Sequence, residues 1–277
     1  MSKEFILKTS LGNDLHVSAF GSHNLGKSPC IIFVHGFKGF KDWGFWPVLA
    51  QHFADNNYFV LTFNFSHNGI GNNLTEFSEL DKFAQNTFSL EISELSELIN
   101  AYLNNYFGPV QNRKIGVLGH SRGGAITLLT SLINKNIDAF AVWATVAVLD
   151  RYTSRQKEKW RKEGVFELMN TRTKQVMSLN TTLLDDVEKN KNGSLNIEKA
   201  VSQLNKPLLI AHGDQDLVVR IKEAELLYSY ADKTKTEFFK IPGASHTFNT
   251  QHPHIGSNKK FNALIEKTLQ FFNNYLS

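Results

Sequence analysis

Short runs of apolar residues alternate along this chain with longer segments in which apolar residues recur every three or four positions. The short runs predict buried β-strands, and the longer segments predict amphipathic helices. The expected strands cover 5–9, 15–20, 30–34, 58–63, 114–118, 139–147, 207–211 and 236–241, and the expected helices cover 46–53, 88–106, 125–133, 222–231 and 259–275. Strands that alternate with helices build a largely parallel sheet with helices on both faces. The predicted fold class is therefore α/β, in a single domain spanning residues 1–277.

The alternation breaks between about residues 150 and 205. Basic residues crowd the start of this segment, at positions 151, 155, 157, 159, 161 and 162. A structureless loop of this length is rare in a compact domain. We therefore expect an insertion that forms a small, largely helical cap near the carboxyl ends of the strands. The alternative is a solvated helical surface, since most runs of charge serve that purpose.

The most informative motif is Gly119-His120-Ser121-Arg122-Gly123, which lies between an expected strand and an expected helix. In that context G-x-S-x-G predicts a sharp turn that exposes a nucleophilic serine, with glycines where the backbone passes close to its neighbours. The helix that begins at the serine directs its free N–H groups toward the reaction centre. The alternative is a serine that merely caps a helix. We predict that Ser121 is a nucleophile.

A serine nucleophile needs a base, and a histidine on a late loop is the expected partner. His246 follows an expected strand and lies among small residues, so it is the preferred candidate. His252 and His254 lie close by and are the rivals. Their His-x-His spacing also permits a weak metal-site interpretation, but no cluster of carboxylates or thiolates supports one. No metal and no cofactor are predicted.

The acid that orients the base should lie past a strand end, between the serine and the histidine in chain order. Asp214 and Asp216 both follow the expected strand at 207–211. Asp214 directly follows a glycine at the turn, where aspartate often makes only local hydrogen bonds. Asp216 is therefore preferred, and Asp150 is the outside candidate.

Acyl transfer also requires two hydrogen-bond donors for the oxyanion. The backbone N–H of Arg122 follows the serine, and the backbone N–H of Phe37 follows the strand at 30–34, so these two are the predicted donors. The same early loop is rich in aromatic residues. We expect Phe40, Trp43 and His120 to contact the substrate, because aromatic walls suit acyl or aryl groups.

Four pieces of the sequence together resemble the α/β-hydrolase superfamily over nearly the full length of the chain. They are His35-Gly36-Phe37, the serine motif, His212-Gly213-Asp214-Gln215-Asp216 and Gly243-Ala244-Ser245-His246. Within the superfamily, the chain is most similar to bacterial esterases and serine peptidases grouped with dienelactone hydrolases and cinnamoyl or feruloyl esterases. The resemblance implies nucleophile Ser121, acid Asp216 and base His246.

Two departures from the related sequences are informative. Many relatives carry Asp-x-Arg-Gly-x-Gly after the strand at 58–63, where this chain has Asn64-Phe65-Ser66-His67-Asn68-Gly69. The structural role of that arginine is therefore missing or replaced. Dienelactone hydrolases use a cysteine nucleophile, so the serine here argues against that particular activity.

Composition narrows the possible functions further. The net charge is only +4 and the basic residues are scattered, which does not favour nucleic-acid binding. The single cysteine, Cys30, excludes an intramolecular disulfide. The sequence has no stretch typical of a signal peptide or a membrane span, so we expect a cytoplasmic protein. The predicted function is hydrolysis of short-to-medium acyl or aromatic esters. Peptide or amide cleavage and a non-catalytic binding role are the alternatives, and the oligomeric state is left open.

Overall fold

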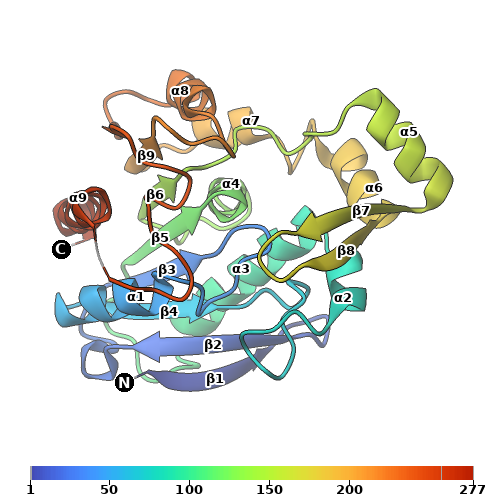
Figure 1. The fold of residues 1–277 in the computed structure, drawn as a ribbon. Helices are drawn as coiled ribbons and strands as arrows, with labels where there is room; N and C mark the ends of the chain where they lie inside the picture. Colours follow the sequence, from blue (N-terminus) through green and yellow to red (C-terminus); the bar gives the residue numbers. More distant parts are fainter. Residues whose placement is uncertain (1, 257, 277) are drawn as a thin grey trace.

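A single eight-stranded sheet forms the centre of the computed structural model, which describes residues 2–256 and 258–276 (Figure 1). Its strand order is β1-β2-β4-β3-β5-β6-β9-β10. The strands are β1 (Lys3–Lys8), β2 (Asp14–Phe20), β3 (Cys30–Val34), β4 (Phe59–Phe63), β5 (Ile115–His120), β6 (Ala139–Trp143), β9 (Leu208–Gly213) and β10 (Thr236–Ile241). Only the pairs β1–β2 and β2–β4 are antiparallel. The mostly parallel sheet predicted from the apolar runs is confirmed.

Helices cover both faces of this sheet (Figure 1). On one face lie α1 (Trp46–Asp55) and α9 (Lys259–Leu276), which are joined by an edge-to-face contact between Phe53 and Phe272. On the other face lie α3 (Phe88–Leu103), α4 (Arg122–Thr130), α7 (Ile197–Ser202) and α8 (Ile221–Tyr230), each in contact with the next. Every residue of β3, β4, β5, β6 and β9 is buried, as expected for strands covered on both sides.

The segment between β6 and β9 leaves the sheet and folds beside it (Figure 1). It contains α5 (Ser154–Glu163), a hairpin of β7 (Val165–Asn170) and β8 (Gln175–Asn180), α6 (Thr181–Asn190) and α7. Trp160 is fully buried and packs against Tyr152 and Phe166. The hairpin was not expected from the sequence, which predicted a largely helical segment. Its strands alternate inward and outward residues, with Met177 and Leu179 buried, so period-two patterning operates there.

Several predicted elements, among them β6 and α3, end earlier than the apolar pattern suggested. β6 stops at Trp143 because Ala144 takes a positive φ of 48° and turns the chain. α3 stops at Leu103, and Asn105 has a φ of 64°, a left-handed conformation that asparagine tolerates well. Two short elements were not predicted: α2 (Leu80–Ala84), which packs against β8, and the 3-10 helix η1 (Ser22–Asn24).

Among the helices of the described residues, none combines the length and the apolar character needed to cross a bilayer.

Candidate active site

Ser121 occupies the sharp turn between β5 and α4. Its φ of 56° and ψ of −124° lie in a region that residues other than glycine rarely adopt. Its N–H donates to the Trp143 carbonyl at 2.8 Å, which fixes the turn against β6. A Cβ added at Gly119 would lie 2.5 Å from the Gly123 carbonyl, and one added at Gly123 would lie 2.3 Å from the Val34 carbonyl. Both motif glycines are therefore needed for steric reasons.

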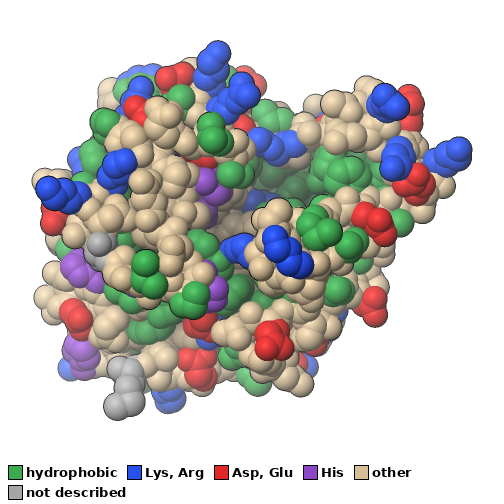
Figure 2. Space-filling model, viewed as in Figure 1, with side chains coloured by type: hydrophobic (Ala, Val, Ile, Leu, Met, Phe, Trp, Pro, Cys, Tyr) green, Lys and Arg blue, Asp and Glu red, His purple; other side chains and the backbone are tan. Residues whose placement is uncertain are grey.

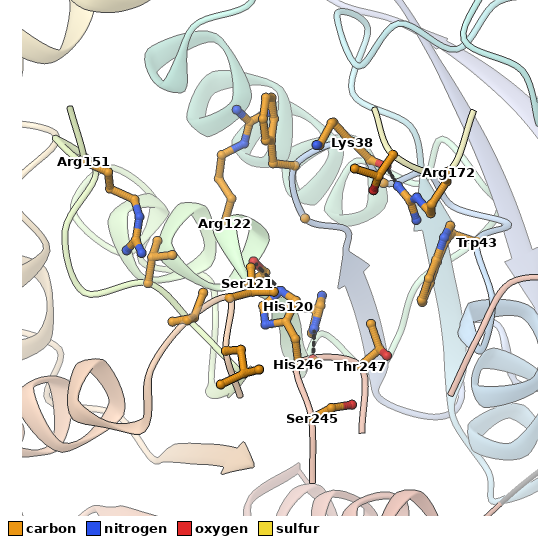
Figure 3. Close-up of a pocket in the computed structure, with 18 of the residues that line it drawn as sticks. Lys38, Trp43, His120, Ser121, Arg122, Arg151, Arg172, Ser245, His246 and Thr247 are labelled. Carbon is orange, nitrogen blue, oxygen red and sulfur yellow. Dashed lines mark hydrogen bonds between the residues drawn. The ribbon is translucent and has the colours of Figure 1, made fainter. Parts of the chain in front are cut away.

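The loops after β9 and β10 bring Asp216 and His246 to this serine. Figure 3 shows His246 beside Ser121. His246 Nε2 lies 3.1 Å from Ser121 Oγ, and His246 Nδ1 lies 2.7 Å from Asp216 Oδ2. Because an ionised carboxylate only accepts hydrogen bonds, Nδ1 carries the proton and Nε2 is free to accept the serine hydroxyl. The structure thus brings together the three side chains selected from the sequence, in a single hydrogen-bonded series.

Asp216 is 4% exposed and well supplied with hydrogen-bond donors. Its Oδ1 accepts the backbone N–H groups of Val218 and Val219, each at 2.8 Å, and His212 Nε2 lies 3.3 Å from Oδ2. Burial alone would raise the pKa of Asp216, but the bonds from His212 and His246 outweigh it and hold this pKa below its usual value. The carboxylate is therefore ionised and positioned to orient His246. The contribution of His212 was not predicted.

Two further histidines near the site are neutral. Burial, with the nearby His246 adding to it, lowers the pKa of His120 to about 3, and burial lowers the pKa of His35 to about 4. His120 Nε2 donates to the His246 carbonyl at 2.9 Å, which ties the loop after β10 to the serine turn. His35 Nδ1 lies 3.0 Å from the Gly36 carbonyl. His120 lines the pocket as predicted, and its hydrogen bond also positions the loop that carries His246.

The rival acids have other partners. Asp214 Oδ1 accepts the backbone N–H of Gly243 at 2.6 Å, a contact that joins the loops after β9 and β10. Asp150 pairs with Lys157 at 2.5 Å in the segment that leaves the sheet. Neither carboxylate has a hydrogen bond to His246 within the described residues.

The rival histidines also lie elsewhere. His252 Nδ1 accepts the backbone N–H of Gly44 at 2.9 Å, and its ring stacks on that of Trp43 at 6.1 Å between centroids. His254 lies near Phe261, with 6.3 Å between ring centroids. In residues 2–256 and 258–276, no group of three or more His, Cys, Asp or Glu side chains is arranged to bind a metal.

The two predicted oxyanion donors flank Ser121 in the same pocket. A Cβ at Gly36 would lie 3.0 Å from the Ser121 Cβ, so this glycine allows the early loop to approach the serine turn. Within the described residues, neither the Phe37 N–H nor the Arg122 N–H has a protein acceptor. The Arg122 guanidinium stacks on the Phe37 ring at 4.4 Å and pairs with the buried Glu91 at 2.5 Å. The Arg122 side chain thus links the two loops that carry these donors.

Ser121 and His246 open onto a cavity of about 650 Å³. Figure 2 shows the hollow between the body of the molecule and the segment around α5, with hydrophobic and basic side chains at its edges. Trp43 lines this cavity, as predicted. Phe40 does not: it is 3% exposed and packs against Phe77 and His252, so the structure does not support its predicted role in substrate contact.

Several pocket residues were not predicted from the sequence. Arg151, Tyr152 and Arg172 reach the cavity from the segment between β6 and β9, and Lys38 reaches it from the early loop. Leu217 and Val218 are strongly exposed at its edge. The basic run near residue 151 was the available signal, but the sequence does not show which of its members face the pocket.

The loop that replaces Asp-x-Arg-Gly-x-Gly is held by asparagines. Asn64 Oδ1 accepts the Lys41 N–H at 2.7 Å, and Asn68 Oδ1 accepts the Ile70 N–H at 3.0 Å. Asn68 Nδ2 lies 3.4 Å from His35 Nε2. Local amide contacts thus hold this loop in place.

Comparison with known protein families shows to which family the chain belongs. The sequence pattern of the prolyl oligopeptidase family of serine peptidases matches residues 50–277, which is most of the chain. The chain belongs to this family. As a member of the prolyl oligopeptidase family it is a serine hydrolase with the α/β-hydrolase fold, and the resemblance inferred from its motifs is confirmed. A search of curated protein sequences finds no significant match.

Solved structures with the same fold cover 98–100% of this chain. Est1E from Butyrivibrio proteoclasticus with ferulic acid bound has a TM-score of 0.73 at 17% identity, over 98% of each chain. An esterase domain from Rhodothermus marinus has a TM-score of 0.66 at 17% identity, over 100% of each chain. A puromycin-hydrolysing peptidase from Mycobacterium tuberculosis has a TM-score of 0.69 at 16% identity, over 100% of this chain and 39% of that one. At these identities the likeness shows the fold alone.

Proposed function

We propose that this serine hydrolase cleaves carboxylic esters through an acyl-enzyme formed on Ser121. The observation that carries the proposal is the hydrogen-bonded series from Asp216 through His246 to Ser121, which ends in a cavity of about 650 Å³. Ser121 Oγ attacks the ester carbonyl while His246 Nε2 accepts its proton, and the proton then passes to the departing alkoxide. Water repeats the sequence on the acyl-serine and releases the acid.

Charge developed in this reaction is stabilised by groups already in place. The negative charge on the carbonyl oxygen accepts hydrogen bonds from the backbone N–H groups of Phe37 and Arg122, which have no competing protein acceptor within the described residues. The positive charge on His246 is balanced by Asp216, whose lowered pKa keeps it ionised. No cofactor is required for either step.

The lining of the pocket favours esters over peptides with a free amino terminus. Among the described residues that line it, four are cationic and none is a carboxylate. A peptide ammonium group would meet like charge there and would find no carboxylate to pair with. The apolar surface from Trp43, Leu149 and Val218 suits a short-to-medium acyl or an aromatic group. Est1E, a structural neighbour, holds ferulic acid, which supports aromatic esters as candidates.

Peptide or amide cleavage is the second candidate, favoured by the family and by the likeness to a puromycin-hydrolysing peptidase. It uses the same three residues but requires protonation of an amine leaving group by His246.

Fluorophosphonate labelling followed by a substrate panel tests both candidates. We expect the wild type to be labelled, Ser121→Ala to lose labelling and all hydrolysis, and the exposed control Ser202→Ala to behave as wild type. The panel comprises 4-nitrophenyl acetate, butyrate, octanoate and cinnamate together with aminoacyl 4-nitroanilides. Unchanged hydrolysis by Ser121→Ala would remove the nucleophile. Turnover of the anilides with negligible turnover of every ester would replace the ester proposal by the peptidase one.

A further inference from the structure

The four basic side chains of the pocket wall differ in whether their charge is balanced. Arg122 pairs with Glu91 at 2.5 Å, and Arg151 pairs with Glu223 at 2.7 Å. The other two, Lys38 and Arg172, have no carboxylate partner within residues 2–256 and 258–276. Figure 3 shows these last two side chains at one end of the cavity and Arg151 at the other. The uncompensated positive charge is thus concentrated at a single end.

Lys38 and Arg172 approach each other from segments that lie 134 residues apart. Lys38 follows Phe37 in the early loop, and Arg172 lies in the turn of the β7–β8 hairpin. The Arg172 guanidinium donates to the Lys38 carbonyl and lies 5.4 Å from the centre of the Trp43 ring. Lys38 Nζ lies 3.5 Å from the Met169 carbonyl. Main-chain carbonyls and an aromatic face therefore orient both cations while leaving their charges unbalanced.

Holding two like charges together costs free energy, which a bound anion would recover. Burial, aided by the neighbouring Arg172, lowers the pKa of Lys38, and burial lowers the pKa of Arg172. A guanidinium offers a planar pair of donors that matches a carboxylate, and an ammonium next to it adds a third donor. A single carboxylate suits an otherwise largely apolar pocket better than a polyanion.

We propose that Lys38 and Arg172 form a subsite for a carboxylate carried by the substrate, so that the preferred esters contain one free carboxylate in addition to the ester bond. This proposal rests on the proposed ester hydrolysis. Because Lys38 and Arg172 line the same pocket as Ser121 and Phe37, the proposed oxyanion donor, a carboxylate bound between them shares the cavity with the scissile carbonyl. It belongs either to a dicarboxylic acid esterified at one end or to the alcohol.

The test compares kcat/KM for matched anionic and neutral esters. On the acyl side, ethyl hydrogen succinate, glutarate and adipate are paired with the corresponding ethyl ester carboxamides, and proton release is followed at constant pH. On the alcohol side, 4-acetoxybenzoate is paired with its carboxamide. We expect the wild type to favour the anionic member of at least one pair by about tenfold or more, as a charge-assisted hydrogen bond provides. This ratio should fall as salt is added.

Arg172→Gln and Lys38→Gln should each reduce that ratio severalfold, and the double variant should abolish it. Arg172→Lys should restore part of the preference because it keeps the charge. The matched control is Lys174→Gln, which removes an exposed positive charge two residues along the same hairpin turn and should leave the ratio unchanged. Thermal unfolding of each variant identifies any that fail to fold, and Lys38→Gln decides the question if Arg172→Gln is one of them.

A binding measurement separates this proposal from the proposed function. Calorimetry with the Ser121→Ala protein should detect ethyl hydrogen glutarate or another preferred anionic ester, and Arg172→Gln in that background should weaken binding. If Ser121 reacts with the fluorophosphonate and neutral esters are hydrolysed, but neither series shows a preference for the anionic ester, the subsite proposal alone is overturned. A preference that survives the double variant would do the same. No labelling and no turnover of any ester would overturn both proposals.

Discussion

The buried ion pair between Glu91 and Arg122 makes a quantitative prediction for Glu91→Ala. Glu91 is 1% exposed, and its Oε1 accepts from Arg122 Nη2 at 2.5 Å and from Asn86 Nδ2 at 2.7 Å. Burial raises the pKa of Glu91, and the positive charge of Arg122 opposes that rise. The substitution removes the carboxylate and leaves the Arg122 guanidinium, only 12% exposed, without its counter-charge.

Removing one partner of a buried pair costs about 3–5 kcal/mol, because the remaining charge stays desolvated. For a protein of this size each kcal/mol lowers Tm by about 2–4 °C, so the expected loss is about 6–20 °C. Activity should fall as well. The Arg122 side chain stacks on Phe37, and the backbone N–H groups of both residues are the proposed oxyanion donors. Urea unfolding and kcat/KM on 4-nitrophenyl butyrate measure the two effects separately.

The double variant Glu91→Leu/Arg122→Met is the control that isolates the unpaired charge. With both charges replaced by apolar groups of similar size, it should be more stable than Glu91→Ala alone. Glu91→Gln, which keeps an acceptor for Asn86, should lie between the wild type and Glu91→Ala. A loss below about 1 kcal/mol in Glu91→Ala would show that water reaches Arg122 freely, and the reasoning from burial would then be wrong.

Three further predictions concern Asp216, Gly124 and Glu94. Asp216→Asn should lower kcat on 4-nitrophenyl butyrate by about 10⁴-fold with an unchanged circular dichroism spectrum, since the amide favours the wrong tautomer of His246; a loss below about tenfold would contradict its role. In Gly124→Ala the new Cβ would lie 1.9 Å from Thr145 Oγ1, so the free energy of unfolding should drop by about 1–3 kcal/mol. Adding Thr145→Ala should recover part of this loss, and no recovery would mean that the contact is not its cause. Burial raises the pKa of Glu94 to about 7 from an ordinary value of 4.5. Between pH 4.5 and about 7 the Glu94 carboxyl group therefore stays protonated in the folded state and is ionised in the unfolded state. The free energy of unfolding is consequently highest at low pH and declines as the pH rises through this range. Glu94→Gln should flatten this part of the urea-unfolding profile, and a profile identical to the wild type would refute the shift.

The positions of the sheet strands along the chain and the choice of Ser121, His246 and Asp216 could be predicted because each rests on local pattern. Apolar runs identify buried strands, and loops after parallel strands meet at one edge of the sheet. The choice of Asp216 over Asp214 followed from position within the loop, and the structure shows Asp214 bonded to a turn instead. These inferences needed no knowledge of long-range packing.

The remaining features depend on contacts between distant segments. Phe40 and Trp43 have the same aromatic character and lie three residues apart, yet only Trp43 lines the pocket, because the direction of each ring is set by its neighbours. The meeting of Lys38 with Arg172 requires the β7–β8 hairpin, whose short strands lie in a segment that the sequence predicted to be largely helical. The composition indicated a basic segment, but it could not indicate which charged side chains the fold brings together.

Because β6 pairs directly with β9, the part of the sheet that positions Ser121 and Asp216 is held independently of the segment that lies between these two strands in sequence. Phe140 pairs with Leu208 and Trp143 with Ala211, so the register of these strands is set by their own hydrogen bonds. The chain leaves after one strand and returns to its immediate neighbour. Insertions and deletions between them can accumulate during divergence without moving Ser121 or the loop that carries Asp216. Replacing this segment with that of a relative is thus a direct route to a different substrate range with the same catalytic residues.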